Sequence, residues 1–318
     1  MPDTAIGIRT YENGDLDSVL DLLRASLGES ALLRRTSELF AWKHFHNPFG
    51  RSILLVAEAD DRIVGLRAFM RWELVTPDGN TVSCVRAVDT ATHPQYQRRG
   101  IFRSLTEAAI AEANAQEVDM VFNTPNPKSG AGYLKMGWHV VGDIGVLAAP
   151  CRGLFGARPP SDGVGDVTDF LVTPQPVTGL DFEDRSARGL RTPRSPEYLR
   201  WRFAGHPTAR YFRIDAGDST CVVRPNVRNH RREVVLSDVL GPSPRSAIRA
   251  TRKACRAAYL AGWFSDGSPE RRAAVRSGMI PVPRLTTLTL VARPLRRLPV
   301  DTASLDSWDF ASSDLELL

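Results

Sequence analysis

The sequence THPQYQRRGIFRSL, Thr92 to Leu105, decides the fold prediction for this chain. A predicted strand ends near Thr92, a Gln-Arg-Arg-Gly turn follows, and a helical pattern begins directly after Gly100. The first backbone N–H groups of a helix have no intrahelical partner, and the helix dipole adds positive potential there. Such a turn can bind a pyrophosphate through its amides, and glycine allows close approach to the backbone. The alternative is a plain strand-to-helix turn with two solvated arginines.

A second segment, one helix and one strand later, favours the phosphate-binding interpretation. NPKSGAGYLKMGW spaces six residues as a motif: Asn126, Ser129, Tyr133, Lys135, Gly137 and Trp138. This spacing resembles the pattern Asn-x-x-Ala/Ser-x-x-x-Tyr-x-Lys-x-Gly-aromatic of the GNAT acetyltransferase superfamily. The Gln-Arg-Arg-Gly turn resembles the acetyl-CoA loop of the same family. The resemblance covers residues 6 to 146 and is most specific between Val88 and Trp138.

The resemblance implies that acetyl-CoA, or another acyl-CoA, is the co-substrate. It implies that the turn amides hold the pyrophosphate, that the preceding strand pairs with the pantetheine arm, and that two residues of the second motif contact the arm from the far side. The implied cofactor-binding residues are Ala91, Thr92, Gln97, Arg98, Arg99, Gly100, Ile101, Phe102, Arg103, Asn126, Ser129 and Tyr133. Phe102 stands where the family usually has a small residue. A Phe102 side chain turned into the core would leave the amides free, whereas one facing the ligand would weaken binding.

Direct attack of an amine on a thioester needs an acid for the leaving thiolate and a base or water relay for the ammonium. Tyr133 is the predicted acid, because a phenol is protonated at neutral pH and is similar to a thiol in acidity; a core aromatic is the alternative. Asp89, on the strand before the turn, is the predicted base, and a solvated or salt-bridged carboxylate is equally open. His93 ranks below Asp89, and His44 and His46 could border the acceptor site or end a surface helix.

Periodicity predicts a mixed α/β fold, with a central sheet flanked by helices, for the first half of the chain. An amphipathic helix is expected from Asp15, which is placed to cap it. Further helices are expected after Gly100 and around Tyr133. Strands are expected at Ile6 to Arg9, Ser52 to Ala57, Ile63 to Phe69, Thr81 to Thr92, DMVFNT (119–124) and Trp138 to Val146.

The second half repeats landmarks of the first. SELFAWKHFHNP (37–48) is similar to SPEYLRWRFAGHP (195–207), and YLKMGWHVV is similar to AVRSGMIPV, which pairs Gly137 with Gly278. A Gly- and Pro-rich linker is expected at Cys151 to Pro176. We therefore expect two tandem GNAT-like domains, a catalytic domain at 1–155 and a degenerate copy at 156–318; the alternative is an unrelated α/β domain.

The second copy lacks the residues that carry the chemistry in the first. Counting back from Gly278 places Ala274 at the position of Tyr133 and Gly267 at that of Asn126. The segment SDVLGPSPR replaces the Gln-Arg-Arg-Gly turn, and each proline removes an amide donor. We expect this copy to bind no cofactor and instead to help shape the acceptor pocket.

Composition excludes several classes. The net charge is +5, without the long basic run of a nucleic-acid-binding surface. The four cysteines show no CxxC spacing, so no metal is expected. No apolar stretch approaches the ~20 residues of a membrane span, and the start lacks a signal-peptide pattern, so we expect no membrane contact and a cytoplasmic location.

The sequence thus predicts acyl transfer, most simply of acetyl, from CoA to the amine of a small molecule. A protein or peptide acetyltransferase, an enzyme that takes aminoacyl or carrier-protein donors, and an acetyl-CoA sensor without turnover are the alternatives.

Overall fold

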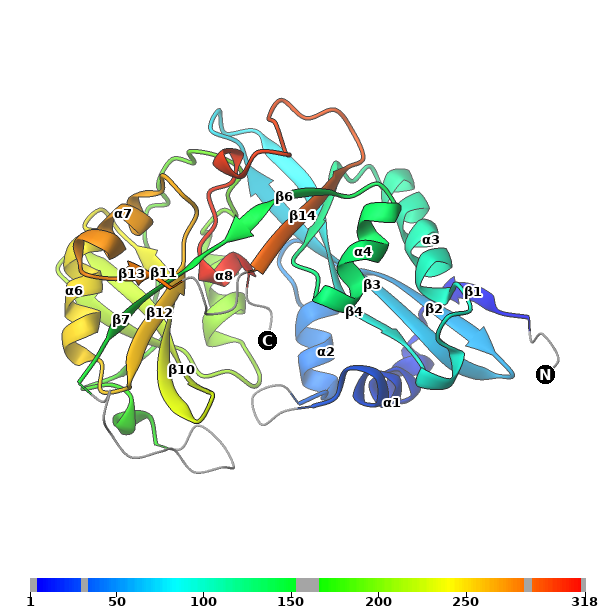
Figure 1. Ribbon diagram of the computed structural model, residues 1–318, viewed down its shortest axis with the longest axis horizontal. Helices are drawn as coiled ribbons and strands as arrows, with labels where there is room; N and C mark the ends of the chain where they lie inside the picture. The colour runs from blue at the N-terminus through cyan, green and yellow to red at the C-terminus, as the bar shows by residue number, and fades with distance from the viewer. Residues whose placement is uncertain (1–4, 30–33, 153–165, 283–287, 316–318) are drawn as a thin grey trace. The chain divides into compact units, whose positions relative to one another are not determined.

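The structure of this chain is a computed structural model that describes residues 5–29, 34–152, 166–282 and 288–315 (Figure 1). The chain forms two compact units. The first unit comprises Met1–Leu74, Thr81–Val141 and Leu290–Asp301, and the second comprises Val75–Asn80, Gly142–Thr289 and Thr302–Leu318. Each unit is built on a seven-stranded sheet, so both match the expected mixed α/β class.

The first sheet has the strand order β1-β2-β3-β4-β5-β14-β6. Strands β1, β2 and β3 are antiparallel neighbours, β4 and β5 are parallel, and β14 is antiparallel to β5. The strands are β1 (Gly7–Thr10), β2 (Ile53–Ala59), β3 (Arg62–Val75), β4 (Thr81–Thr92), β5 (Met120–Asn123), β14 (Leu288–Pro294) and β6 (His139–Ile144). The helices of this unit are η1 (Asn13–Asp15), α1 (Leu16–Leu27), α2 (Ser37–His44), η2 (Pro94–Tyr96), α3 (Ile101–Ala115) and α4 (Pro127–Lys135).

Strand β2 shows why helices cover both faces of this sheet. Successive side chains of a strand point to opposite faces. Ile53, Leu55 and Ala57 join the core cluster that contains the apolar side of α3, whereas Leu54 and Val56 join the cluster that contains α1. The continuous apolar run SILLVA is therefore a strand that is buried on both faces.

The first helix begins as expected, but Asp15 does not cap it. Its carboxylate accepts hydrogen bonds from the backbone N–H of Glu12 and from the Arg9 guanidinium, both at 2.7 Å. Asp15 thus stabilises the short helix η1 that leads into α1, because the chain makes a 3₁₀ turn before the α-helix starts.

The second sheet has the order β13-β7-β12-β11-β10-β9-β8. Its strands are β8 (Gln175–Pro176), β9 (Phe212–Ala216), β10 (Ser219–Arg228), β11 (Arg231–Leu240), β12 (Tyr259–Trp263), β7 (Val146–Pro150) and β13 (Ile280–Pro281). The helical segments are η3 (Val167–Asp169), α5 (Pro196–Leu199), the π-helical turn η4 (Arg200–Ala204), α6 (Pro244–Ala254), α7 (Pro269–Arg276), η5 (Leu305–Ser307) and α8 (Ser312–Leu315).

The two sheets correspond strand by strand, which confirms the tandem arrangement. In the first unit, α3 connects the parallel strands β4 and β5; in the second, α6 connects the parallel strands β11 and β12. Trp42 lies in α2 and Trp201 in η4, and Gly137 and Gly278 both have positive φ, 89° and 83°, before a strand. The sequence similarity therefore reflects a repeated fold.

Each sheet also takes one strand from the other half of the sequence. The orange strand β14 lies between β5 and the green strand β6 in the first sheet, and β7 lies between β13 and β12 in the second (Figure 1). The single strand expected at Trp138 to Val146 is thus divided between two sheets. The sequence carries no signal for this exchange, because a strand pattern does not specify its neighbours.

The expected boundary near residue 155 lies outside the described residues. The later part of the expected linker is folded, since Phe170 and Leu171 are fully buried in the core of the second unit and β8 pairs with β9. No helix in the described part of the chain has the length and apolar character needed to cross a membrane.

The strand exchange predicts that residues 1–145 do not fold on their own. Without β14, the paired edge of β5 and the buried side chains that pack against Val291 lose their partner. Circular dichroism and size-exclusion chromatography should show an unfolded or aggregated fragment. Joining residues 288–301 to it through a Gly/Ser linker should restore cooperative unfolding. Equal unfolding midpoints for residues 1–145 alone and for the same fragment joined to residues 288–301 would contradict the structural importance of β14.

Candidate functional site

A pocket opens where the pairing of β4 and β5 ends. The two strands are in register only over Cys84–Met120, Val85–Val121 and Arg86–Phe122. Strand β4 then continues to Thr92, and a cavity of about 630 Å³ lies between residues 87–92 and residues 123–126. An uncovered strand edge offers backbone donors and acceptors to an extended ligand.

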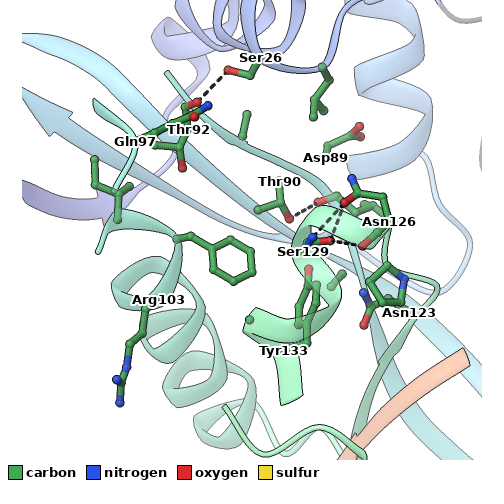
Figure 2. A pocket seen from close by; sticks show the side chains of 18 of the residues that line it. Ser26, Asp89, Thr90, Thr92, Gln97, Arg103, Asn123, Asn126, Ser129 and Tyr133 are labelled. Carbon is green, nitrogen blue, oxygen red and sulfur yellow. Dashed lines mark hydrogen bonds between the residues drawn. The ribbon is translucent and has the colours of Figure 1, made fainter. Parts of the chain in front are cut away.

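The structure brings the predicted site residues together around this pocket (Figure 2). Asp89 and Tyr133 line it, as do all the predicted cofactor-binding residues except Arg99. Arg99 instead places its guanidinium carbon 4.9 Å from the ring centre of Tyr96. The lining residues among those predicted are Asp89, Ala91, Thr92, Gln97, Arg98, Gly100, Ile101, Phe102, Arg103, Asn126, Ser129 and Tyr133.

The turn before α3 leaves its amides free. Arg98 and Gly100 have positive φ angles of 66° and 79°, and α3 starts at Ile101. Among the described residues, none accepts a hydrogen bond from the backbone N–H groups of residues 98–103, and Ser104 is the first to bond back, to the Gly100 carbonyl at 3.0 Å. A Cβ built on Gly100 would meet nothing within 4 Å. Free amides at a helix start suit the binding of an anion, and residues of this turn line the pocket.

The partly buried Phe102 ring packs against Tyr133 and also lines the pocket. Its ring meets that of Tyr133 edge-on, with the ring centres 5.4 Å apart. A Cβ added to Gly132 would lie 2.9 Å from the Phe102 Cε1 atom, so α4 passes close over this ring. The side chain therefore lies between α3 and α4 at the wall of the pocket, so both orientations considered from the sequence are met in part.

Asn126 and Ser129 interact with each other as well as with the pocket. The Asn126 side-chain oxygen accepts hydrogen bonds from the Ser129 backbone N–H at 3.0 Å and from the Ser129 hydroxyl at 3.1 Å (Figure 2). This is an N-terminal cap that fixes the start of α4. Both side chains are thus held in place at the rim of the pocket.

Arg67 is a site residue that the sequence analysis missed. It lies in β3, is fully buried, and donates hydrogen bonds to the Tyr133 hydroxyl at 2.8 Å, to Thr106 Oγ1 at 2.8 Å and to Thr90 Oγ1. Among the described residues, no carboxylate forms an ion pair with it. A buried cation without a counter-charge is costly, which makes its position beside Tyr133 informative. An arginine within the apolar strand IVGLRAF was the available signal.

The contact with Arg67 sets the direction of the Tyr133 hydroxyl proton. A guanidinium has only donors, so the phenol oxygen must accept from Arg67, and its own O–H remains available to donate. Figure 2 shows this hydroxyl on the side of the ring nearest Thr90 and Ser129, within the pocket. Tyr133 can therefore deliver a proton to a group bound there.

Asp89 is the centre of a buried charge cluster. Its carboxylate contacts Arg35 at 2.9 Å, Lys43 at 3.0 Å and His44 Nε2 at 3.3 Å, and its φ angle of 40° is unusual for a strand residue. Burial by itself raises the pKa of Asp89, but the charge of Lys43 and the hydrogen bond from His44 outweigh burial and hold that pKa well below its usual range. These contacts argue against the predicted role of Asp89 as general base, because its oxygens are occupied and bind a proton weakly.

The three histidines considered from the sequence lie outside the pocket lining. His44 is fully buried, and burial lowers its pKa, so the neutral form is favoured. His46 is exposed. His93 accepts a hydrogen bond from the Gln95 backbone N–H at 3.3 Å and so caps the short helix η2.

Within the described residues, no group of three or more His, Cys, Asp or Glu side chains is arranged to hold a metal ion. The four cysteines, all described, carry free thiols.

Comparison with known proteins defines the class. Residues 7–141 match the family model described as an acetyltransferase (GNAT) domain. The fold is similar to a GCN5-related N-acetyltransferase from Anabaena variabilis (TM-score 0.60, 11% identity, covering 91% of this chain and 72% of that one). It is also similar to Eis1 from Mycobacterium abscessus (TM-score 0.60, 13% identity, 91% and 73%).

A tandem GNAT protein from the clavulanic acid biosynthesis pathway matches along its whole length (TM-score 0.57, 14% identity, covering 93% of this chain and 100% of that one). At these identities the likeness concerns the fold. No curated protein matches the sequence. The N-terminal half of the chain thus matches the acetyltransferase (GNAT) domain model, and the two-unit fold is similar to that of a tandem GNAT protein.

The charge cluster predicts a large stability loss for Asp89→Asn. The variant leaves Arg35 and Lys43 buried without their carboxylate, so the free energy of unfolding at neutral pH should fall by about 3–5 kcal/mol. Because the folded-state pKa of Asp89 is lowered, its stabilisation is complete above the unfolded value of about 3.9 and declines as the pH falls below it. Urea unfolding should therefore show a difference between wild type and variant that is constant near neutrality and shrinks in acid.

Asp61→Asn is the matched control for this measurement. Asp61 also has a positive φ, 56°, but it is exposed and forms no ion pair among the described residues. A similar decrease in the free energy of unfolding in both variants would contradict the importance of the charge cluster around Asp89.

Proposed function

We propose that the chain transfers an acyl group, most simply acetyl, from a CoA thioester to the amine of a small molecule by direct attack. The observation that carries this proposal is the arrangement of one pocket, which has free amides at one end, an uncovered strand edge along its side and the Tyr133 hydroxyl inside it.

Backbone groups fit the phosphate and pantetheine parts of CoA. The N–H groups of residues 98–103 can hold the pyrophosphate at the start of α3, where the helix dipole favours negative charge. The edge of β4 at residues 87–92 can pair with the amides of the pantetheine arm, with Asn126 and Ser129 on the opposite side. We propose that the thioester then lies toward Tyr133.

Tyr133 is proposed as the acid. When the thioester breaks, the leaving sulfur needs a proton, and the Tyr133 O–H is free to donate one because its oxygen already accepts from Arg67. Arg67 is proposed to support this step, because its buried positive charge stabilises the negative charge that develops on the phenol oxygen and on the sulfur.

Asp89 is proposed as a fixed charge that holds β4 in shape. Among the described residues that line the pocket, it is the one carboxylate, and no histidine is present. We therefore propose that the proton of the substrate ammonium leaves through a water relay rather than directly to a side chain.

CoA binding should depend on Gly100. We expect one CoA molecule per chain by calorimetry, and Gly100→Ala should weaken binding by about tenfold or more, because a Cβ enters the space beside the amides and the φ angle of 79° is strained for alanine. Gly79→Ala is the control, with φ of 80° and open space around its Cβ but no place in the pocket. Equal affinities in both variants would argue against this site.

Tyr133→Phe should lower kcat by about 10²–10⁴-fold and leave CoA affinity nearly unchanged, since it removes a proton donor but keeps the packed ring. The measurement is thiol release with a panel of small amines and one lysine peptide. Tyr11→Phe removes a hydroxyl from the same unit outside the pocket and should be neutral. An unchanged rate in Tyr133→Phe across the pH range would exclude the acid role.

The same assay tests Arg67. Arg67→Met should also lower kcat, and the double variant with Tyr133→Phe should lose little more than either single variant, because the two side chains act as one unit. Turnover with the peptide alone would instead indicate a protein acetyltransferase, and CoA binding without turnover would indicate a sensor.

A further inference from the structure

The second unit contains a groove between α6 and α7 that is lined by basic side chains. Two adjoining pockets, of about 550 and 580 Å³, share Arg245, Arg249 and Arg276 in their walls. No Asp or Glu lines either of them. We call this feature the arginine groove; its basic residues are Arg152, Arg245, Arg249, Arg252, Lys253, Arg272 and Arg276.

The helical spacing concentrates these charges on facing sides of α6 and α7. Arg245 and Arg249 are four residues apart, and Arg252 follows three residues later. On α7, Arg272 and Arg276 are again four apart. Side chains with this spacing are neighbours on a helix surface, and like charges there repel. The folded chain therefore keeps a concentrated positive charge in a concave site.

None of these cations has a carboxylate partner among the described residues. This is unlike other arginines of the same unit. Arg185 contacts Glu270 and Asp309, and Arg194 contacts Asp238 and Asp314. The charges of the arginine groove are thus left available to an external anion.

The floor of the groove carries two buried donors without acceptors. Arg252 donates through Nη1 to the Ser277 carbonyl, which anchors its side chain against the end of α7. Its Nε, however, and the hydroxyl of Ser277, a residue only 6% exposed, have no hydrogen-bond partner among the described residues. Buried polar groups in folded proteins are almost always paired, so these atoms point to a ligand that supplies acceptors.

The groove occupies the position that corresponds to the proposed CoA pocket of the first unit, but it is built differently. Helix α6 follows β11 as α3 follows β4. Pro242 and Pro244 have no N–H, so the amide cradle is absent here and guanidinium groups stand around the helix start instead. Guanidinium groups bind phosphate oxygens in pairs of parallel hydrogen bonds.

We propose that the arginine groove binds a small anion that carries two or more phosphoryl groups. The clustered charge requires several negative charges close together, and the concave walls favour a compact ligand. The lining residues include no aromatic side chain on which a nucleobase could stack, so a single-stranded nucleic acid fits poorly.

Calorimetry with inorganic triphosphate and the full chain tests the proposal. We expect a triphosphate site that is retained in the Gly100→Ala variant, with an affinity that falls as salt is added. Arg249→Ser combined with Arg276→Ser should weaken binding by at least about tenfold, since each lost charged hydrogen bond alone is worth that much. Arg200→Ser combined with Arg210→Ser makes the same charge change on exposed residues outside the groove and should leave the affinity within about twofold.

Titration with CoA identifies the source of the phosphoryl groups. A second CoA site that disappears in the Arg249/Arg276 double variant would show that the groove takes the phosphates of a CoA. A single CoA site that persists in this variant, together with lost triphosphate binding, would indicate a free polyphosphate. Absence of triphosphate binding at low salt, equal losses in both double variants, or binding of duplex DNA in preference to triphosphate would overturn the proposal.

Discussion

The buried ion pairs of Asp89 are the constraint on which the site of the first unit depends. A positive φ angle in a strand costs about 1–2 kcal/mol for a residue other than glycine, and β4 carries one at Asp89. Arg35 and Lys43 hold the carboxylate in this position. The pairing with β5 ends three residues earlier, at Arg86, so the distorted part of β4 is the part that borders the pocket.

Two buried charges with opposite environments lie at this pocket: Asp89 lines it, and Arg67 lies behind Thr90 and Tyr133, which line it. Asp89 is a buried anion compensated by neighbouring cations, and it stays charged. Arg67 is a buried cation whose hydrogen-bond partners are hydroxyl groups, and among the described residues no carboxylate forms an ion pair with it. The first arrangement suits a structural role and the second suits stabilisation of developing negative charge, because uncompensated charge in a low dielectric acts strongly on its surroundings.

The second unit keeps the strand-to-helix connection of the first unit but has different chemical groups at the start of the helix. In the first copy, a glycine-containing turn presents amides at the start of α3; in the second, prolines remove them and arginine side chains surround the start of α6. The exchange of β7 and β14 ties the two copies together, since each sheet is completed by a strand from the other half of the sequence. Divergence of the second copy is therefore possible without loss of its structural role.

The sequence by itself determined the class of fold, the repeat and the residues around the first pocket, because these follow from local patterns: period-2 strands, a Gly-containing turn before a helix, and a motif of fixed spacing. The tertiary structure alone decided which strand completes each sheet, that Arg67 reaches the Tyr133 hydroxyl, and that Asp89 is enclosed by Arg35, Lys43 and His44. These features join residues 45 to 174 positions apart, and no local pattern encodes such contacts. The environment of a titratable group, and hence its protonation, is a property of the folded chain.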